Sequence, residues 1–221
     1  MPAIRLIIFD WDGTLMDSEA AIVEAMTSAY RDVDVTPPPY GAIRDIIGLS
    51  LDDSVSRLSP GLATQDRAGI VTGYRRHYGM LADTPVLFPG VLDTLEALHD
   101  AGFYLAVATG KSRAGLARAI AQTGLAHLFL STRTADESEP KPSPAMLHEI
   151  LDELDVEPDG ALMLGDTEYD LTMARAAGTH AGAVAYGAHA PDRLRRHGPA
   201  FLIDEFSHLP ARIAALPGTA K

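Results

Sequence analysis

Short, wholly apolar segments recur along the chain, and from residue 91 onward they alternate with segments of helical periodicity. The apolar segments occupy residues 4–9, 104–108, 128–131, 161–164 and 181–186. Apolar positions at helical spacing lie between them, within residues 91–98, 116–120 and 146–154. Strands that are apolar throughout and alternate with helices form a parallel sheet covered on both faces. The pattern therefore predicts an α/β fold, in which helices cover both faces of a Rossmann-like parallel sheet.

The stretch between the first two apolar segments breaks this alternation. It contains no strand-like pattern, but apolar positions repeat at helical spacing within residues 22–30, 51–58 and 70–78. Three consecutive prolines, at 37–39, separate the first of these patterns from the second. A connection this long without secondary structure of its own is uncommon in a compact domain. We therefore predict a helical cap domain inserted after the first strand.

The insertion divides the chain into two predicted domains. The core would comprise residues 1–16 and 83–221, and the helical cap would comprise residues 17–82. Hinges between them would lie near residues 16–19 and 82–88. The alternative is that the additional helices pack on the same core as the sheet.

Polar residues follow three of the predicted strands at the point where each strand ends. Asp10 and Asp12 follow the first strand. Thr109 and Gly110 follow the second, and Asp166 follows the fourth. The carboxyl ends of parallel strands meet at one edge of a sheet, where ligands bind in open α/β folds. The sequence therefore predicts a site at this edge that combines carboxylates, a hydroxyl and a glycine turn.

The carboxylates of this site suit a hard metal ion. Asp10 and Asp12 are two residues apart, so an extended backbone directs both side chains to one side. Two carboxylates this close resist joint ionisation unless a cation is present. Asp166 supplies a further carboxylate, and Asp170 shares a helical face with it. Oxygen ligands with no Cys or His nearby favour Mg²⁺.

Residues 107–112, with the sequence VATGKS, end like the phosphate-binding P-loop of nucleotide hydrolases. A P-loop requires a glycine five residues before the glycine of its Gly-Lys-Ser. That position is Leu105, inside a predicted strand, so the P-loop interpretation is excluded. The Thr109 hydroxyl and backbone N–H groups at a helix N-terminus still suit a single phosphoryl group. Lys111 is interpreted as a solvated side chain outside the site.

Lys141 lies between Pro140 and Pro142, in a loop that these prolines stiffen. Ser143 is the predicted N-cap of the helix that follows, with Pro144 at its first position. A cation fixed near carboxylates and phosphate would neutralise negative charge in a transition state. We therefore include Lys141 among the candidate catalytic residues.

Four short motifs together resemble those of a known family. They are DWDGTL at residues 10–15, Thr109-Gly110 within VATGKS, Lys141 within KPSP, and GDTEYD at residues 165–170. Their order and their places at strand ends resemble the haloacid dehalogenase superfamily, specifically its Mg²⁺-dependent phosphatases related to phosphoglycolate phosphatase. The resemblance covers essentially the whole chain. It implies hydrolysis of a small phosphomonoester, phosphoglycolate-like or a sugar phosphate, through an aspartyl-phosphate.

The resemblance also implies roles for individual residues in this chemistry. Asp10 would be the nucleophile that forms the aspartyl-phosphate. Asp12 would protonate the leaving oxygen and then activate the water that cleaves the intermediate. Thr109 and the Gly110 N–H would bind the phosphoryl oxygens, beside Lys141.

The metal site follows from the same resemblance. Mg²⁺ would bind the carboxylates of Asp10 and Asp166 together with the backbone carbonyl of Asp12. Asp170 would hold either water at the metal ion or the Lys141 ammonium. Asp170 also fits a helix capping box with Thr167, and the two interpretations are compatible.

The cap would select the substrate, because the core motifs only handle phosphate. Residues 44–50 resemble the family's specificity loop, and Arg44 and Gly48 are substrate-binding candidates. The Arg44 guanidinium would reach a substrate carboxylate or a second phosphate, and a surface arginine is the alternative. Glu19, beside the first hinge, is a further candidate. The basic cluster at residues 193–197 is interpreted as a solvated helix face.

Composition and charge limit the classes of molecule that this protein is expected to bind. The 18 basic and 30 acidic residues give a net charge of −12, which repels nucleic acid and anionic lipid. A small anionic phosphate ester would be repelled too unless a cation offsets the field, which agrees with a Mg²⁺ site. The absence of cysteine excludes disulfides and thiolate chemistry. The first apolar segment is too short to span a membrane and lacks a signal peptide's cleavage region, so we expect a cytoplasmic protein. We also expect a monomer or weak homodimer.

Three other functions compete with hydrolysis. A dehalogenase needs neither Asp12 nor the GDTEYD motif, which argues against that chemistry. A phosphomutase similar to β-phosphoglucomutase needs a cap that excludes water, usually with additional basic groups, and the basic residues of this cap are few. A non-catalytic module that binds metal or phosphate would not need the acid/base Asp12. Hydrolysis is therefore the prediction, with the phosphomutase and the binding module as alternatives.

Overall fold

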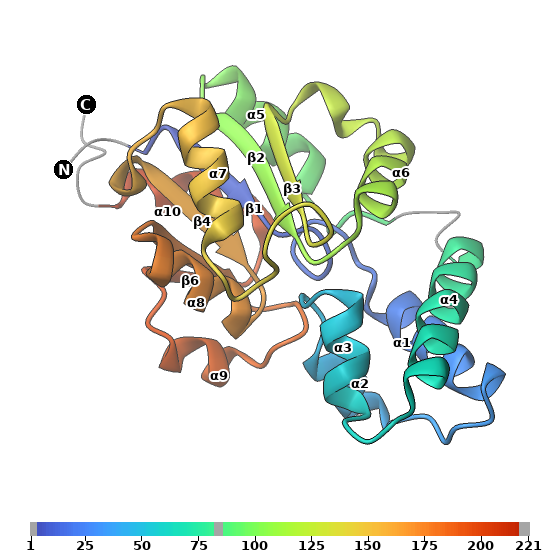
Figure 1. Cartoon of the computed structure of the whole chain (residues 1–221). Helices are drawn as coiled ribbons and strands as arrows, with labels where there is room; N and C mark the ends of the chain where they lie inside the picture. The colour runs from blue at the N-terminus through green and yellow to red at the C-terminus, as the bar shows by residue number, and fades with distance from the viewer. Residues whose placement is uncertain (1–3, 82–85, 217–221) are drawn as a thin grey trace.

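A six-stranded parallel sheet forms the centre of the computed structural model, which describes residues 4–81 and 86–216 (Figure 1). Its strands run in the order β3-β2-β1-β4-β5-β6. Their bounds are β1 Leu6–Phe9, β2 Tyr104–Thr109, β3 Ser131–Thr134, β4 Ala161–Gly165, β5 His180–Val184 and β6 Phe201–Ile203. The predicted fold class, an α/β fold with a parallel sheet and an inserted helical cap, is confirmed.

Strand β1 lies at the middle of the sheet and fixes where the chain enters the site. Phe9, its last residue, pairs with Val107 of β2 on one side and Leu164 of β4 on the other. The residues that follow these three strands therefore emerge together at one edge. Alternate side chains of β1 enter opposite hydrophobic clusters, Ile7 on one face and Ile8 on the other.

Helices cover both faces of the sheet, as the apolar strands require. One face packs against α5 (Val91–Asp100), α6 (Arg113–Thr123) and α10 (Leu209–Ala214). The other packs against α7 (Ala145–Leu154) and α8 (Glu168–Ala177), with α9 (Pro191–Arg196) beside α8. Three 3-10 turns complete the core: η1 Leu125–His127, η2 Pro158–Gly160 and η3 Phe206–His208.

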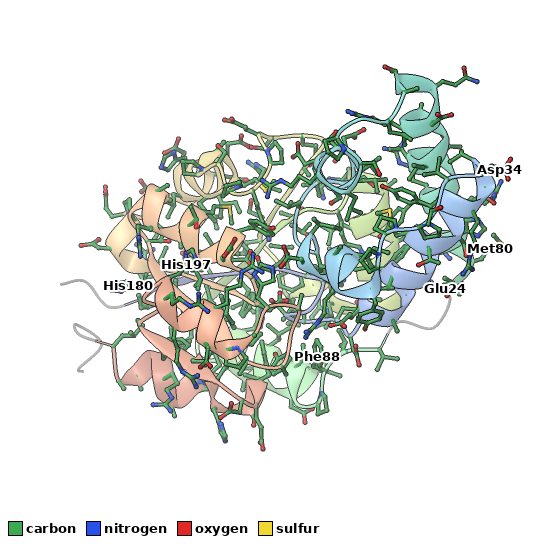
Figure 2. The ribbon with its side chains drawn as sticks, turned by 90° about the horizontal axis from the view of Figure 1, so that it is seen from below. Glu24, Asp34, Met80, Phe88, His180 and His197 are labelled. Atoms are coloured by element: carbon green, nitrogen blue, oxygen red, sulfur yellow. The ribbon has the colours of Figure 1, made fainter. Side chains whose placement is uncertain are left out.

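Four helices between β1 and α5 form the insertion and have a hydrophobic cluster of their own. They are α1 (Glu19–Asp32), α2 (Tyr40–Asp45), α3 (Leu51–Leu58) and α4 (Thr64–Leu81). The helices lie together on one side of the sheet (Figure 1). Seen from below, Glu24, Asp34 and Met80 mark this end of the molecule, and His180 and His197 lie at the opposite end (Figure 2).

The two connections between the sheet and the insertion run side by side. The Asp17 N–H donates to the Val86 carbonyl at 2.8 Å, and the Phe88 N–H donates to the Leu15 carbonyl at 3.0 Å. The first predicted hinge, residues 16–19, begins in this paired segment. Residues 82–85 of the second predicted hinge, 82–88, lie outside the described residues.

Several local predictions differ from the structure. The strand expected at residues 128–131 is β3 at Ser131–Thr134, because Leu128 follows a 3-10 turn and packs in the core. β3 lies at the sheet edge and is polar, so it gave no apolar signal. Strand β6 was not predicted, since three residues are too few to show a period. Pro144, rather than Ser143, occupies the N-cap of α7, and the Ser143 Oγ accepts a 3.4 Å hydrogen bond from the Ala145 N–H.

None of the helices within the described residues combines the length and apolar character needed to cross a membrane.

Candidate active site

The carboxyl edge of the sheet brings together the polar residues that follow β1, β2 and β4. Asp10, Thr109 and Asp166 are all buried there, each with an exposed fraction of 1% or less. Asp12 is also buried, whereas the intervening Trp11 packs into the hydrophobic core, as alternation along an extended chain requires. The predicted strand-end residues therefore lie in one site.

A buried ammonium joins two carboxylates at the centre of this site. Lys141 Nζ lies 2.7 Å from Asp10 Oδ1 and 2.7 Å from Asp170 Oδ1. Burial acts to lower the pKa of Lys141, but the two carboxylates outweigh burial and raise that pKa above its ordinary value. Burial raises the pKa of Asp10 well above its ordinary range, and Lys141 only partly offsets the increase. Lys141 therefore stays positively charged and forms an ion pair with Asp10.

The capping box predicted for α8 is present and fixes Asp170. Asp170 Oδ2 accepts hydrogen bonds from the Thr167 N–H at 3.0 Å and the Thr167 hydroxyl at 2.7 Å. Its other oxygen faces Lys141. Of the two contacts implied for Asp170, the one with the Lys141 ammonium is present, and the capping function coexists with it.

Three buried carboxylates, those of Asp10, Asp166 and Asp170, offer oxygen atoms within 4.8 Å of one another. Burial, followed by the charge of Asp170, raises the pKa of Asp166 to about 7. Asp10 Oδ1 faces the Lys141 ammonium, whereas Asp10 Oδ2 has no partner among the described residues. Buried carboxylates that repel one another, with an oxygen left unpartnered, fit a divalent cation, and this donor set suits Mg²⁺.

Asp166 is held rigidly by its surroundings. The Thr14 hydroxyl donates to its Oδ1 at 2.8 Å, and the Ala188 N–H donates to its Oδ2 at 2.7 Å. Gly13 has a φ of +83°, and a Cβ there would lie 2.3 Å from Asp166 Oδ2. Only glycine allows the chain after β1 to turn this close to the carboxylate. The Asp12-Gly13 turn is therefore shaped around Asp166.

Lys111 contacts Asp12, and the prediction that it is solvated is wrong. Its side chain is only 8% exposed, and Nζ lies 3.0 Å from both Asp12 oxygens. Nζ also donates to the Tyr78 hydroxyl of α4 at 3.1 Å. The Ser18 hydroxyl donates to Asp12 Oδ1 at 2.6 Å. The predicted acid/base residue thus has two polar neighbours that sequence reasoning did not assign to it.

The glycine turn after β2 lies against the insertion. A Cβ on Gly110 would lie 2.4 Å from the Leu49 carbonyl oxygen and 2.5 Å from that of Gly48. Gly48 itself has a φ of +98°, and a Cβ there would lie 3.2 Å from the Thr167 hydroxyl. The loop between α2 and α3 therefore covers the turn that would bind phosphate.

A cavity of about 630 Å³ opens between the sheet edge and the insertion. Its lining includes the following residues of the core: Asp10, Asp12, Thr109, Gly110, Lys111 and Arg118. From the insertion it includes Ile22, Met26, Ile47, Gly48, Leu49, Tyr74, Arg75 and Tyr78. Asp10, Asp12 and Thr109 thus face a space that is partly apolar on the side of the insertion, whereas Lys141 lies behind Asp10 and is not among the lining residues.

Two of the predicted cap candidates contact each other rather than the cavity. Arg44 Nε lies 2.9 Å from Glu19 Oε2, and the Arg44 guanidinium donates to the Gly187 carbonyl at 2.9 Å. Neither Arg44 nor Glu19 is among the cavity-lining residues, whereas Gly48 is. Through Gly187, Arg44 joins the insertion to the segment that supports Asp166.

The basic cluster of α9 is only partly a solvated face. Arg193 forms ion pairs with Glu168 of the core and Asp45 of the insertion, and its hydrogen bond to Glu168 lowers the pKa of that carboxyl to about 2. His189 receives the Glu168 N–H on Nδ1, and its Nε2 lies 3.1 Å from the Asp45 carbonyl. Within the described residues, the exposed Arg195 forms an ion pair with Asp192 alone. Sequence spacing gave no signal for this contact between insertion and core.

The family model described as haloacid dehalogenase-like hydrolase matches residues 7–184, and the chain belongs to this family. The "Probable phosphatase IndB" of Dickeya dadantii is 35% identical, over 96% of this chain and 94% of that protein. A phosphoglycolate phosphatase of Aliivibrio fischeri is 33% identical, over 93% and 95%. The crystal structure of a predicted phosphoglycolate phosphatase from Haemophilus somnus superposes with a TM-score of 0.85 at 25% identity, over 96% and 98%. The family predicted from the four motifs is therefore confirmed.

Proposed function

We propose that this protein is a Mg²⁺-dependent phosphatase that hydrolyses a small phosphorylated metabolite through an aspartyl-phosphate at Asp10. The observation that carries the proposal is the state of the Asp10 carboxylate. It is buried at the edge of the cavity, and one oxygen lies 2.7 Å from the Lys141 ammonium. The other oxygen has no partner among the described residues, so a lone pair is free to attack phosphorus.

In the first step, an Asp10 oxygen forms a bond to phosphorus while the bond from phosphorus to the ester oxygen breaks. The departing oxygen takes the electron pair of that bond and the proton of the Asp12 carboxyl group. Thr109 and the Gly110 N–H would hold the phosphoryl oxygens, because both lie at the turn after β2 that lines the cavity. Lys141 would offset the negative charge of the transition state.

In the second step, water replaces the Asp10 oxygen on phosphorus. The water oxygen bonds to phosphorus, its proton passes to the Asp12 carboxylate, and the electron pair of the breaking bond returns to Asp10. Inorganic phosphate then leaves, and Asp12 is protonated for the next cycle. The same carboxyl group therefore serves first as acid and then as base.

Mg²⁺ would be held by the carboxylates of Asp10 and Asp166 and the backbone carbonyl of Asp12, with Asp170 beside them. Bound there, the ion supplies positive charge that screens these carboxylates from the phosphoryl group. Burial and the charge of Asp170 raise the pKa of Asp166 to about 7, and a bound cation would oppose both effects. The net charge of −12 would also repel an anionic substrate, so the protein as a whole favours a cation at the site.

The substrate would be a small ester such as phosphoglycolate or a sugar phosphate. The name of the Aliivibrio fischeri relative supports phosphoglycolate, and a cavity of about 630 Å³ is large enough for either class. Residues 17–82 would act as the cap that closes over this substrate. A monomer or weak homodimer in the cytoplasm, with no nucleic-acid or membrane partner, remains our prediction.

Phosphate release tests the proposal directly. Purified protein would be assayed on p-nitrophenyl phosphate, phosphoglycolate and several sugar phosphates, in Mg²⁺ and in excess chelator. We expect Mg²⁺-dependent release of inorganic phosphate, fastest with one metabolite of the panel. A phosphomutase would isomerise a sugar phosphate with little release, and a binding module would release none, so either result would contradict hydrolysis.

A further inference from the structure

We propose that Lys111 is a positioning residue that holds the Asp12 carboxyl group in place for proton transfer, and that Tyr78 of α4 holds Lys111. This inference rests on the proposed function, because it concerns the acid/base residue of that reaction. The role proposed for Lys111 differs from that of Lys141, which pairs with Asp10 and Asp170 and would offset charge in the transition state.

The Lys111 ammonium has close polar contacts with both Asp12 and Tyr78. An ammonium group carries three hydrogens. Nζ has three acceptors within reach: both oxygens of Asp12, at 3.0 Å each, and the Tyr78 hydroxyl at 3.1 Å. Nζ also lies 4.6 Å from the centre of the Tyr78 ring, at a distance suited to a cation–π contact. These contacts aim the ammonium at the Asp12 carboxylate, so Lys111 in this arrangement orients Asp12.

Asp12 depends on these contacts for its orientation. Among the described residues, the polar side-chain contacts of its carboxylate are with the Ser18 hydroxyl, 2.6 Å from Oδ1, and with Lys111, 3.0 Å from both oxygens. An aspartate has two rotatable side-chain bonds, and a displacement of about 1 Å can cost a proton transfer roughly a hundred-fold. Removing the Lys111 ammonium would leave a single hydrogen bond to hold the acid/base group.

Tyr78 connects this arrangement to the insertion. Lys111 belongs to the loop after β2, whereas Tyr78 lies near the end of α4. The Tyr78 ring stacks on Tyr74 one turn earlier, with ring centres 5.6 Å apart and planes 16° apart, which fixes its direction. Lys111 therefore contacts Tyr78 as well as Asp12 only when α4 packs on the core. Packing of the insertion would thus help to orient the Asp12 carboxyl group.

The leaving group provides a readout that a purely structural role would not change. p-Nitrophenolate departs without a proton, phenolate benefits from one, and an alkoxide requires one. All three phosphate esters lack a second charged group. We therefore expect Lys111→Met to lower kcat/KM for an alkyl phosphate on the order of a hundred-fold, for phenyl phosphate less, and for p-nitrophenyl phosphate only a few-fold.

Asp12 also acts in the second step, which gives an independent signature. With p-nitrophenyl phosphate, Lys111→Met should form the phosphoenzyme at nearly the normal rate but hydrolyse it slowly. A burst of p-nitrophenol, approaching one molecule per enzyme, should precede slow turnover. Lys111→Arg, which keeps a cation, should recover part of the alkyl phosphate activity. Tyr78→Phe, which keeps the ring but not the hydroxyl, should show the same leaving-group pattern at smaller size.

Arg195→Met is the matched control, because it also removes a cation but from an exposed pair with Asp192. Thermal unfolding of all four variants would accompany the kinetics. Equal losses on the three esters for Lys111→Met would overturn the inference and indicate a binding or folding role. Failure of the proposed function is distinguishable, since the unmodified protein would then release no phosphate in Mg²⁺.

Discussion

Replacing Asp166 with Asn should stabilise the metal-free protein at pH 8 while abolishing its response to Mg²⁺. Asp166 is fully buried, and its pKa is raised from 3.8 to about 7, first by burial and then by Asp170. Between these two values the folded protein binds a proton that the unfolded chain has released. The free energy of unfolding therefore falls as the pH rises through this window. A neutral Asn does not titrate and escapes that loss.

The magnitude follows from the two pKa values. Relative to acid pH, the raised pKa removes about 4 kcal/mol of stability at pH 8 but only about 2 kcal/mol at pH 5, because pH 5 lies only about one unit above the unfolded pKa of 3.8. Asn cannot accept hydrogen bonds from both the Thr14 hydroxyl and the Ala188 N–H, which costs about 1–3 kcal/mol at either pH. The advantage of Asp166→Asn should therefore grow by about 2–3 kcal/mol between pH 5 and pH 8.

Urea unfolding in excess chelator, at several values of pH from 5 to 8, measures this difference. Asp192→Asn is the control, because Asp192 is exposed and pairs only with Arg195 among the described residues. Adding Mg²⁺ at about 100 times its Kd should stabilise the unmodified protein by about 2.7 kcal/mol and leave Asp166→Asn unchanged. A difference between variant and parent that does not change with pH would refute the assignment of the raised pKa to Asp166.

Three further predictions test other parts of the site. Chelation should abolish phosphate release, Mg²⁺ should restore it, and Ca²⁺, which prefers larger and looser coordination, should inhibit; full activity in excess chelator would contradict the metal assignment. Asp12→Asn should lower turnover on the order of a hundred-fold while still allowing Asp10 to be phosphorylated by p-nitrophenyl phosphate, as rapid-quench kinetics would show. Arg44→Ala should lower activity on the physiological ester and on p-nitrophenyl phosphate to a similar extent, because Arg44 contacts Glu19 and Gly187 and does not line the cavity; a loss confined to the physiological ester would contradict this.

The core and the central site could be predicted because their signals are local. The apolar run at β1 identifies a buried strand from its own residues, and the rule for strand ends then places Asp10 and Asp166 at one edge. The capping box at Thr167 and Asp170 is likewise a signal within four residues. Such features depend on neighbours along the chain, so one sequence suffices to read them.

Two of the contacts that were not predicted join residues far apart in the chain. Lys111 and Asp12 are separated by 99 positions, and Arg193 and Asp45 by 148. Neither lysine nor arginine carries a local sign of whether its charge is solvated or paired, so a solvated surface was the ordinary interpretation. The pairing of β1 with β2 brings Lys111 to Asp12, and the placement of the insertion on the core brings Asp45 to Arg193.

Trapping the phosphoenzyme tests the central claim most directly. The protein would be mixed with p-nitrophenyl phosphate labelled in the phosphoryl group, quenched in acid within milliseconds, digested and mapped by mass spectrometry. The account predicts label on the peptide that contains Asp10, more of it in Asp12→Asn because hydrolysis of the intermediate is slowed, and none in Asp10→Asn. Phosphate release by a protein that carries no label at Asp10, or undiminished labelling in Asp10→Asn, would contradict it.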